Sequence, residues 1–209
     1  MTRPSPPHAI ILAGGLGQRM DAPARGAPAK PLVRLGGEPL IAHVIARLRP
    51  QVGALWINAN AGAQNYAGFG CELVPDTIPG HPGPLAGVLA GLERLAREDP
   101  GASLLSVPAD TPFLPHDLAA RLQSRQALTG GVVCAGSLGQ RHPVIALWPA
   151  SSRTALRQSL EAGRLKVGLL LDGLKAVTEA WDSEPEDPFF NVNTPEDLAI
   201  AEIRRTARQ

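Results

Sequence analysis

Short apolar runs of strand length alternate along the chain with longer segments in which apolar residues recur at helical spacing. The first run, Ala9–Ala13, is apolar throughout and predicts a strand that is buried on both faces. Later strands are predicted at Ala54–Asn58, Cys71–Val74 and Ser103–Val107. This alternation is typical of βαβ units and of a mostly parallel sheet.

Helices are predicted where apolar residues recur every three or four positions. In Pro39–Arg49, the residues that share one face are Leu40, Ile41, Val44, Ile45 and Leu48. A second helix opens with Pro84 in its first turn and ends near Asp99–Pro100. Thr194 is a good N-cap for a final helix that runs from Pro195 to about Arg205. The other predicted helices are Leu114–Leu128, Ser151–Glu161 and Lys166–Leu171.

Two segments depart from this alternation. Gly14–Pro31 is too rich in glycine, alanine and proline for regular structure and predicts a long loop, of a kind that often carries function. Gly131–Ala135 and Pro143–Trp148 are strands separated by the turn-rich Gly136–Arg141, which indicates a hairpin or an added antiparallel edge. Because no repeat or linker divides the chain, we expect one three-layer α/β domain over residues 1–209, with residues 1–7 as a flexible tail.

The composition narrows the class of protein. Hydrophobic residues make up 44% of the chain and charged residues 19%, which suffices for a folded core. A net charge of +1 is too balanced for a nucleic-acid-binding surface. No apolar run approaches the ~18 residues of a membrane span, and Ala9–Ala13 is too short for a secretory signal. Cys71 and Cys134 stand alone and are interpreted as buried thiols in a reducing compartment, so we expect a cytoplasmic protein.

The carboxyl ends of the strands are where an open parallel sheet binds its ligand. Here the first strand leads into a glycine-rich loop, Leu12–Met20, whose backbone N–H groups suit a phosphate. The loop is not a dinucleotide fingerprint, because Met20 stands where a third glycine is needed. It is not a P-loop either, because no glycine precedes Lys30 and no serine or threonine follows it. Such a loop can also merely turn the chain.

Two basic residues accompany this loop. Only three of the 20 Lys and Arg residues are Lys, and one of them is Lys30. A lysine in such a background can mark a site that prefers a compact ammonium, although three lysines must fall somewhere. Arg19 has only Asp21 as an acidic neighbour in the sequence. An unpaired basic pair beside a glycine-rich loop suits a triphosphate.

Carboxylates follow two of the later strands. Asp110 comes directly after the fourth strand, between Pro108 and Pro112, which stiffen the backbone on both sides. A carboxylate held in this way suits Mg²⁺, although a helix N-cap or an Asx-turn would use the same residue type. Asp76 follows the third strand and has the same alternative.

Amides follow other segments. Asn58 and Asn60 come at the end of the second strand. Asn191 and Asn193 place two amides on one side of an extended segment, or simply precede the capped last helix. Two histidines beside proline-rich turns are interpreted as structural or surface residues, His81 and His142.

Six stretches together carry a family resemblance. They are LAGGLGQRM (Leu12–Met20), INAN (Ile57–Asn60), PGPLAG (Pro82–Gly87), PADTPFLP (Pro108–Pro115), HPVIALW (His142–Trp148) and FFNVNTPEDL (Phe189–Leu198). The chain resembles the molybdenum cofactor guanylyltransferase (MobA) family of nucleotidyltransferases from Ile10 to about Ile203. The first stretch indicates only the wider nucleotidyltransferase group, and the last two narrow it to the molybdenum cofactor branch. The resemblance implies a Rossmann-like α/β fold of the nucleotide-diphospho-sugar transferase type.

The resemblance also implies a reaction and its partners. The terminal phosphate of molybdenum-molybdopterin would attack the α-phosphorus of GTP, giving molybdopterin guanine dinucleotide cofactor and pyrophosphate. Such chemistry depends on positioning and on neutralising charge, with Mg²⁺ as the implied cofactor. Molybdenum-insertion proteins and recipient apo-molybdoenzymes are the protein partners that the resemblance suggests.

Roles follow residue by residue from the same resemblance. Arg19, Lys30 and Asp110 are expected to be catalytic, and Asp110 is also the expected Mg²⁺ ligand. The residues expected to bind the nucleotide are Leu12, Ala13, Gly14, Gly15, Lys30, Asn58, Asp76 and Asp110. Those expected to face the molybdopterin substrate are Pro84, Leu85, Gly87, Lys166, Asn191 and Asn193.

Two departures from the family pattern and three alternatives remain. The loop after Met20 is longer than usual and Ala29 precedes Lys30, and Arg164–Val167 stands where the family tends to have a basic run.

A cytidylyltransferase acting on the same cofactor, or another small-phosphate nucleotidyltransferase, would use the same chemistry. A non-catalytic nucleotide-binding or regulatory protein would keep only the fold. Guanine and cytosine can be told apart by backbone groups, which leave no trace in the sequence.

Overall fold

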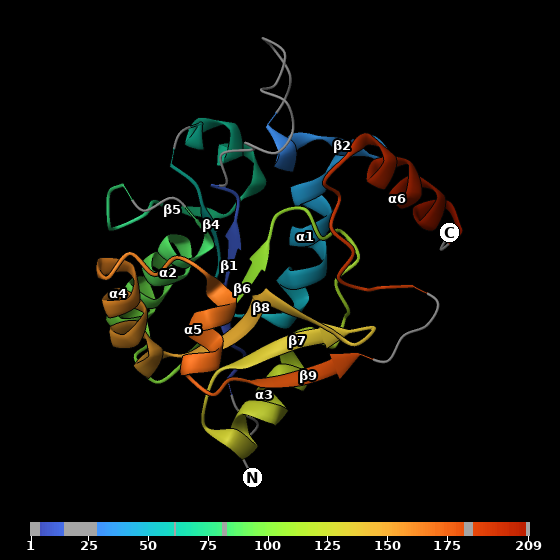
Figure 1. Cartoon of the computed structure of the whole chain (residues 1–209). Coiled ribbons are helices and arrows are strands. Elements are labelled where there is room, and N and C mark those ends of the chain that lie inside the picture. Colours follow the sequence, from blue (N-terminus) through green and yellow to red (C-terminus); the bar gives the residue numbers. More distant parts are fainter. Residues whose placement is uncertain (1–4, 15–28, 61, 81–82, 182–185, 208–209) are drawn as a thin grey trace.

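A seven-stranded sheet forms the centre of the computed structural model, which describes residues 5–14, 29–60, 62–80, 83–181 and 186–207. Its strand order is β5-β4-β1-β6-β8-β7-β9, and helices cover both faces (Figure 1). The strands are β1 (His8–Leu12), β4 (Leu55–Asn58), β5 (Glu72–Val74), β6 (Ser103–Pro108), β7 (Val133–Ser137), β8 (Gln140–Pro149) and β9 (Val177–Trp181). The α-helices are α1 (Leu40–Leu48), α2 (Pro84–Glu98), α3 (Leu118–Thr129), α4 (Arg153–Glu161), α5 (Val167–Gly173) and α6 (Pro195–Ala207).

The register of the central strands brings their carboxyl ends to one edge. β1 pairs in parallel with β4 on one side and β6 on the other, so Leu12 lies opposite both Asn58 and Pro108. β8 alone runs antiparallel to its sheet neighbours, β6 and β7. The segments that follow β1, β4, β5 and β6 therefore leave the sheet together, at the top of Figure 1.

Two apolar layers hold the helices to the sheet. Along β1, Ala9 and Ile11 point into the layer that contains α1 and α3, whereas Ile10 points into the layer that contains α2 and α4. This alternation explains why the first strand is apolar throughout, because both of its faces are covered. The apolar faces predicted for α1 and α2 are confirmed, since Leu40, Ile41, Val44, Ile45 and Leu48 are all buried, as are Leu85, Val88, Leu89, Leu92 and Leu95.

A small second sheet continues the fold above the carboxyl-end edge. β2 (Arg34–Leu35) pairs with β3 (Glu38–Pro39), directly after the short 3-10 helix η1 (Lys30–Leu32). A third apolar cluster joins this sheet to the C-terminal part of the chain and consists of Leu35, Leu40, Phe113, Val192 and Ala201. The cluster packs β2 against α6 and against the segment that precedes it.

Three short 3-10 helices complete the described elements: η2 (Arg49–Gln51), η3 (Ala63–Phe69) and η4 (Ala150–Ser152). The predicted last helix is confirmed with its cap, because Asp197 N donates to Thr194 Oγ1 (3.1 Å) and Thr194 N donates to Asp197 Oδ2 (2.9 Å). No described helix is long and apolar enough to cross a membrane.

Several sequence-based predictions need correction. The antiparallel strand β8 lies between β6 and β7, so it forms the predicted hairpin but not an added edge. The helix expected from Leu114 begins at Leu118, because Pro115 and the turn after it precede the first helical residue. The edge strand β9 was not predicted, since its sequence mixes polar and apolar residues and only Trp181 is buried. Cys134 is buried, but Cys71 is only partly buried; burial raises the pKa of both thiols.

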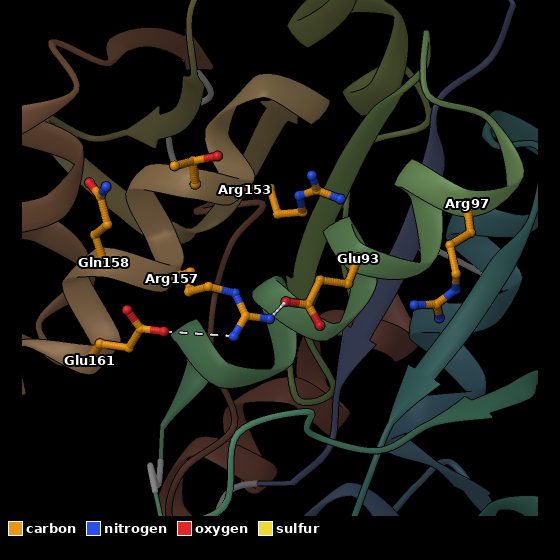
Figure 2. A pocket seen from close by; sticks show the side chains of 7 residues that line it. Glu93, Arg97, Arg153, Arg157, Gln158 and Glu161 are labelled. Carbon is orange, nitrogen blue, oxygen red and sulfur yellow. Dashed lines mark hydrogen bonds and ion pairs between the residues drawn. The ribbon is translucent and has the colours of Figure 1, made fainter.

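A polar groove of about 600 Å³ lies between α2 and α4. Figure 2 shows Arg157 in this groove with its guanidinium between Glu93 and Glu161, and it forms ion pairs with both carboxylates. Acidic and basic side chains thus compensate one another here, and the groove offers exposed side chains for control substitutions.

Candidate active site

The backbone at the carboxyl-end edge stays hydrogen-bonded for one residue beyond β1. Ala13 N donates to Asn58 O (3.0 Å), and Ala109 N donates to Leu12 O (3.3 Å). Ala13 and Gly14 therefore leave the sheet between the ends of β4 and β6, where the sequence predicts a phosphate-binding loop. Gly15 and Arg19 of that predicted loop lie outside the described residues.

Lys30 brings two distant parts of the chain together at this edge. Its ammonium donates to Asp110 Oδ2 and to Asn193 Oδ1. The side chains of Lys30 and Asp110 are 23% and 15% exposed, so the ion pair is mostly shielded from solvent. Val192 N also donates to Asp110 O (3.0 Å), which fixes the backbone beside Asn193. Three residues that the resemblance assigned separately to catalysis and substrate binding thus form one cluster.

The second oxygen of Asp110 has no hydrogen-bond partner in the part of the chain that the structure describes. Among the buried polar side-chain atoms of the described residues, Asp110 Oδ1 alone makes no hydrogen bond. A buried carboxylate oxygen in this state is costly unless a cation or donor approaches it. The described residues contain no group of three or more His, Cys, Asp or Glu side chains suited to a metal. Asp110 Oδ1 therefore fits Mg²⁺, which takes one or two protein carboxylates and completes its shell with water and phosphate oxygens.

A second polar cluster joins the ends of β4 and β5. Asn58 Nδ2 donates to Val74 O (2.9 Å) and to Asp76 Oδ1 (2.8 Å). Asn60 Nδ2 donates to Asp76 Oδ2 (2.7 Å), and its Oδ1 accepts from Asp76 N (2.8 Å). Both carboxylate oxygens of Asp76 are thus oriented by amides. Asn60 had no predicted role, although it stands two residues after Asn58 in the same INAN stretch.

The start of α2 packs very closely against this cluster. Gly83, just before the helix, has φ +137°, a conformation that favours glycine, and Pro84 occupies the first turn. Leu85 as a whole residue is 1% exposed and its side chain belongs to the core, so it does not present a surface to a substrate as the sequence-based assignment expected. A Cβ on Gly87 would lie 2.3 Å from Asn58 Oδ1 and 2.7 Å from Leu12 Cδ2. Gly87 therefore allows α2 to approach the end of β1.

We expect Gly87→Ala to lower the free energy of unfolding by about 1–3 kcal/mol, because the new methyl group must displace Asn58 and Leu12. Thermal unfolding followed by circular dichroism measures the change. The matched control is Gly168→Ala in α5, where an added Cβ meets nothing within 4 Å. That control should be neutral or slightly stabilising. Equal stability of the two variants would contradict the close approach at Gly87.

The remaining predicted substrate residues lie in two places. Asn191 and Asn193 are exposed on either side of the buried Val192, which agrees with two amides on one side of an extended segment. Lys166 is exposed directly before α5, and within the described part of the chain its side chain has no hydrogen bond or ion pair. The structure therefore joins Asn193 to the Lys30–Asp110 cluster and leaves Lys166 apart from it.

Comparisons with known proteins agree with this architecture. A family model described as a MobA-like NTP transferase domain matches residues 9–177. The molybdenum cofactor guanylyltransferase of Rhodopseudomonas palustris (strain BisB5) is 47% identical over 197 residues, which cover 93% of this chain and 91% of that protein. The protein of the same name from Rhizobium meliloti (strain 1021) is 43% identical and covers 94% of this chain and 90% of its own.

Solved structures share the fold. Molybdopterin-guanine dinucleotide biosynthesis protein A from Archaeoglobus fulgidus superposes with a TM-score of 0.78 at 22% identity, over 96% of this chain and 99% of its own. The 4-diphosphocytidyl-2C-methyl-D-erythritolsynthase of Anaerococcus prevotii superposes with a TM-score of 0.69 at 14% identity, over 95% of each chain. The α/β fold class predicted from the sequence is confirmed, and the chain belongs to the MobA-like NTP transferase family.

Proposed function

We propose that this nucleotidyltransferase transfers GMP from GTP to the terminal phosphate of molybdenum-molybdopterin. A phosphate oxygen of the acceptor forms a bond to the α-phosphorus of GTP, the bond from that phosphorus to the β-phosphate oxygen breaks, and pyrophosphate leaves. The products are molybdopterin guanine dinucleotide cofactor and pyrophosphate. The observation that carries this proposal is the convergence of Lys30, Asp110 and Asn193 beyond β1 in a chain 47% identical to a named molybdenum cofactor guanylyltransferase.

The nucleotide would occupy the space beyond β1, β4 and β5. Leu12 and Ala13 would line the nucleotide, although the N–H of Ala13 already donates to Asn58 O. The N–H groups of Gly14, and of Gly15 after it, would donate to phosphate oxygens. Asn58 and Asp76 would hold the nucleoside, and Asn60 orients Asp76 for that contact. Lys30, with Arg19, would balance the charge of the triphosphate and of the leaving pyrophosphate.

Asp110 would hold Mg²⁺ through Oδ1, the oxygen that has no partner among the described residues. Mg²⁺ bound there supplies charge neutralisation and a template for phosphate oxygens. Lys30 donates to Asp110 Oδ2, which would leave Oδ1 to hold the cation.

The acceptor would lie beside Asn191 and Asn193, with Pro84 at the start of α2 and Lys166 reaching its phosphate. The buried Leu85 and Gly87 would support the start of α2 instead of touching the acceptor. Asn193 contacts Lys30, which places an acceptor-side residue directly against a nucleotide-side residue. Reactions in which two phosphates must meet in line depend mainly on such positioning. Molybdenum-insertion proteins and recipient apo-molybdoenzymes remain the proposed protein partners.

Pyrophosphate release by the purified protein tests the function. The assay contains Mg²⁺ and molybdenum-loaded molybdopterin, compares GTP, CTP, UTP and ATP, and confirms the product by mass. We expect turnover with GTP alone. Turnover only with CTP would replace the proposal by a cytidylyltransferase, and GTP binding without turnover would favour a non-catalytic nucleotide-binding protein.

A further inference from the structure

The segment Asp187–Asn193 joins the β7–β8 hairpin to the Lys30–Asp110 cluster. Figure 1 shows it in red, before the chain enters α6. Asp187 stands beside the ends of the hairpin, and Asn193 accepts a hydrogen bond from Lys30. The contacts at the Asp187 end involve none of the residues that were predicted to act in the reaction.

A chain of hydrogen bonds holds Asp187. Its Oδ1 accepts from Ser137 Oγ (2.6 Å) and from Phe189 N (2.9 Å), while Ser137 Oγ also lies 2.7 Å from His142 Nε2. The serine hydroxyl has one proton and gives it to the carboxylate, so His142 Nε2 must donate to Ser137 Oγ. Burial lowers the pKa of His142, outweighing the nearby Asp187 charge, and the neutral ring fits this arrangement when it carries its proton on Nε2. Successive donation in one direction strengthens each bond.

An aromatic side chain closes the same end of the segment. Phe189 is 2% exposed and lies with its ring centre 4.9 Å from that of His142. On its other side it meets Trp181 edge-on at 5.2 Å. Arg204 of α6 donates to Asp187 O (3.2 Å) and covers the ring of Phe190, so α6 adds a further contact. Because Phe189 N donates to Asp187 Oδ1, the carboxylate and the aromatic side chain are held in the same turn.

The far end of the segment is fixed at the site itself. Val192 N donates to Asp110 O (3.0 Å), and Asn193 N donates to Asp197 Oδ2 (2.9 Å). Asn193 is exposed, so its amide position depends on the backbone that carries it. A segment held at both ends samples few conformations, and loss of one attachment restores backbone freedom.

We propose that Asp187, held by Ser137, is a positioning residue that sets Asn193 against Lys30 and so fixes the place of the acceptor phosphate. This inference rests on the proposed function, because it assigns the effect to the acceptor side of that reaction. Asp187 touches no reacting atom and acts through the segment. His142, which was interpreted as structural or surface, supports it by donating to Ser137.

The test compares Asp187→Ala, Asp187→Asn and Ser137→Ala with the unchanged protein. Asp187→Asn retains an oxygen that accepts from Ser137 Oγ and Phe189 N, whereas Asp187→Ala retains none. Ser137→Ala removes the donor to Asp187 Oδ1 and also the acceptor of His142 Nε2, while Asp187 itself is kept. This variant serves if Asp187→Ala does not fold. Arg157→Ala, in the groove between α2 and α4 (Figure 2), is the control for loss of an ion pair away from the candidate site, between the partly exposed Arg157 and the mostly buried Glu93.

Steady-state kinetics provide the first readout. For Asp187→Ala we expect the KM for molybdenum-molybdopterin to rise about tenfold and the KM for GTP to stay within about twofold, because small misplacements of positioning groups have large effects. Ser137→Ala should change the same constants in the same direction but less, and Asp187→Asn should restore most of the loss. An unchanged acceptor KM, an equal rise in both KM values, or equal behaviour of Asp187→Ala and Asp187→Asn would overturn the proposal.

Tryptophan fluorescence provides a readout that does not need activity. Acrylamide quenching is measured for each variant and for its Trp181→Phe counterpart, and the difference isolates Trp181, which contacts Phe189. We expect Trp181 to become more accessible in Asp187→Ala and not in Asp187→Asn or Arg157→Ala. Unchanged quenching of Trp181 in Asp187→Ala would overturn the proposal that Asp187 anchors this segment, whether or not the protein acts on molybdopterin. Inactivity on molybdopterin alone would reject only the proposed function.

Discussion

Asp110→Asn should lower kcat about a thousandfold while GTP still binds, because the chemistry depends on neutralising charge at this position. The substitution keeps the size and shape of the side chain and removes its negative charge. A loss of turnover with retained binding would place Asp110 in the chemical step. Turnover is measured by pyrophosphate release, and GTP affinity by calorimetry at fixed Mg²⁺.

The surroundings of Asp110 explain why an amide cannot replace the carboxylate. Lys30 donates to Oδ2, so the asparagine must turn its carbonyl oxygen toward the ammonium to avoid placing two donors against each other. Its NH₂ group then takes the place of Oδ1, the buried oxygen that has no partner among the described residues. An NH₂ group cannot ligate Mg²⁺. The Mg²⁺ dependence of any remaining turnover should therefore flatten.

Asp172→Asn is the matched control for this change. Asp172 lies in α5 with an exposed side chain and pairs with Arg141 at 2.7 Å. Surface ion pairs of this kind contribute about 0–1 kcal/mol, so neither stability nor turnover should change measurably. If Asp110→Asn turned over at the rate of Asp172→Asn, Asp110 would have no part in the mechanism.

The sheet was predictable because its signal is local. The strands β1, β4, β5 and β6 each lie in a short, mostly apolar run, and β1 is apolar throughout because Ala9, Ile10 and Ile11 alternate between two covered faces. β9 gave no such signal, since its five residues lie at the edge beside β7 and only Trp181 is buried. The position of β8 between β6 and β7 depends on pairing over long separations, which periodicity does not encode.

The site was predictable only in part, because some of its contacts join residues that are far apart in the sequence. Asp110 follows a strand and is flanked by prolines, so its place at the edge could be inferred from neighbouring residues. The hydrogen bond from Asn60 to Asp76 could not be predicted without the register of β4 and β5. Asn58 lies opposite Val74, and the next residues on the same side are Asn60 and Asp76. The contact between Lys30 and Asn193 spans 163 positions and depends on the apolar cluster that includes Leu35 and Val192.

Lys30→Met should reduce kcat/KM for GTP between about a hundredfold and a thousandfold, the range typical for losing one fixed donor at a charged reaction centre. The change removes the ammonium and keeps most of the apolar stem. It leaves the mostly shielded Asp110 Oδ2 without its cationic partner and Asn193 Oδ1 without its donor. We therefore expect kcat/KM to fall for both GTP and the acceptor. Steady-state kinetics in which each substrate is varied in turn measures the two effects separately.

The other two lysines of the chain make a controlled series. Lys175→Met alters an exposed residue after α5 and should leave kcat/KM unchanged, whereas Lys166→Met tests the proposed contact with the acceptor phosphate through the KM for molybdopterin. Lys30→Arg should recover at most about a tenth of the activity, because a planar guanidinium cannot direct donors from one atom to Asp110, Asn193 and a phosphate. Full activity of Lys30→Arg would show that charge alone suffices, and full activity of Lys30→Met would remove Lys30 from the site.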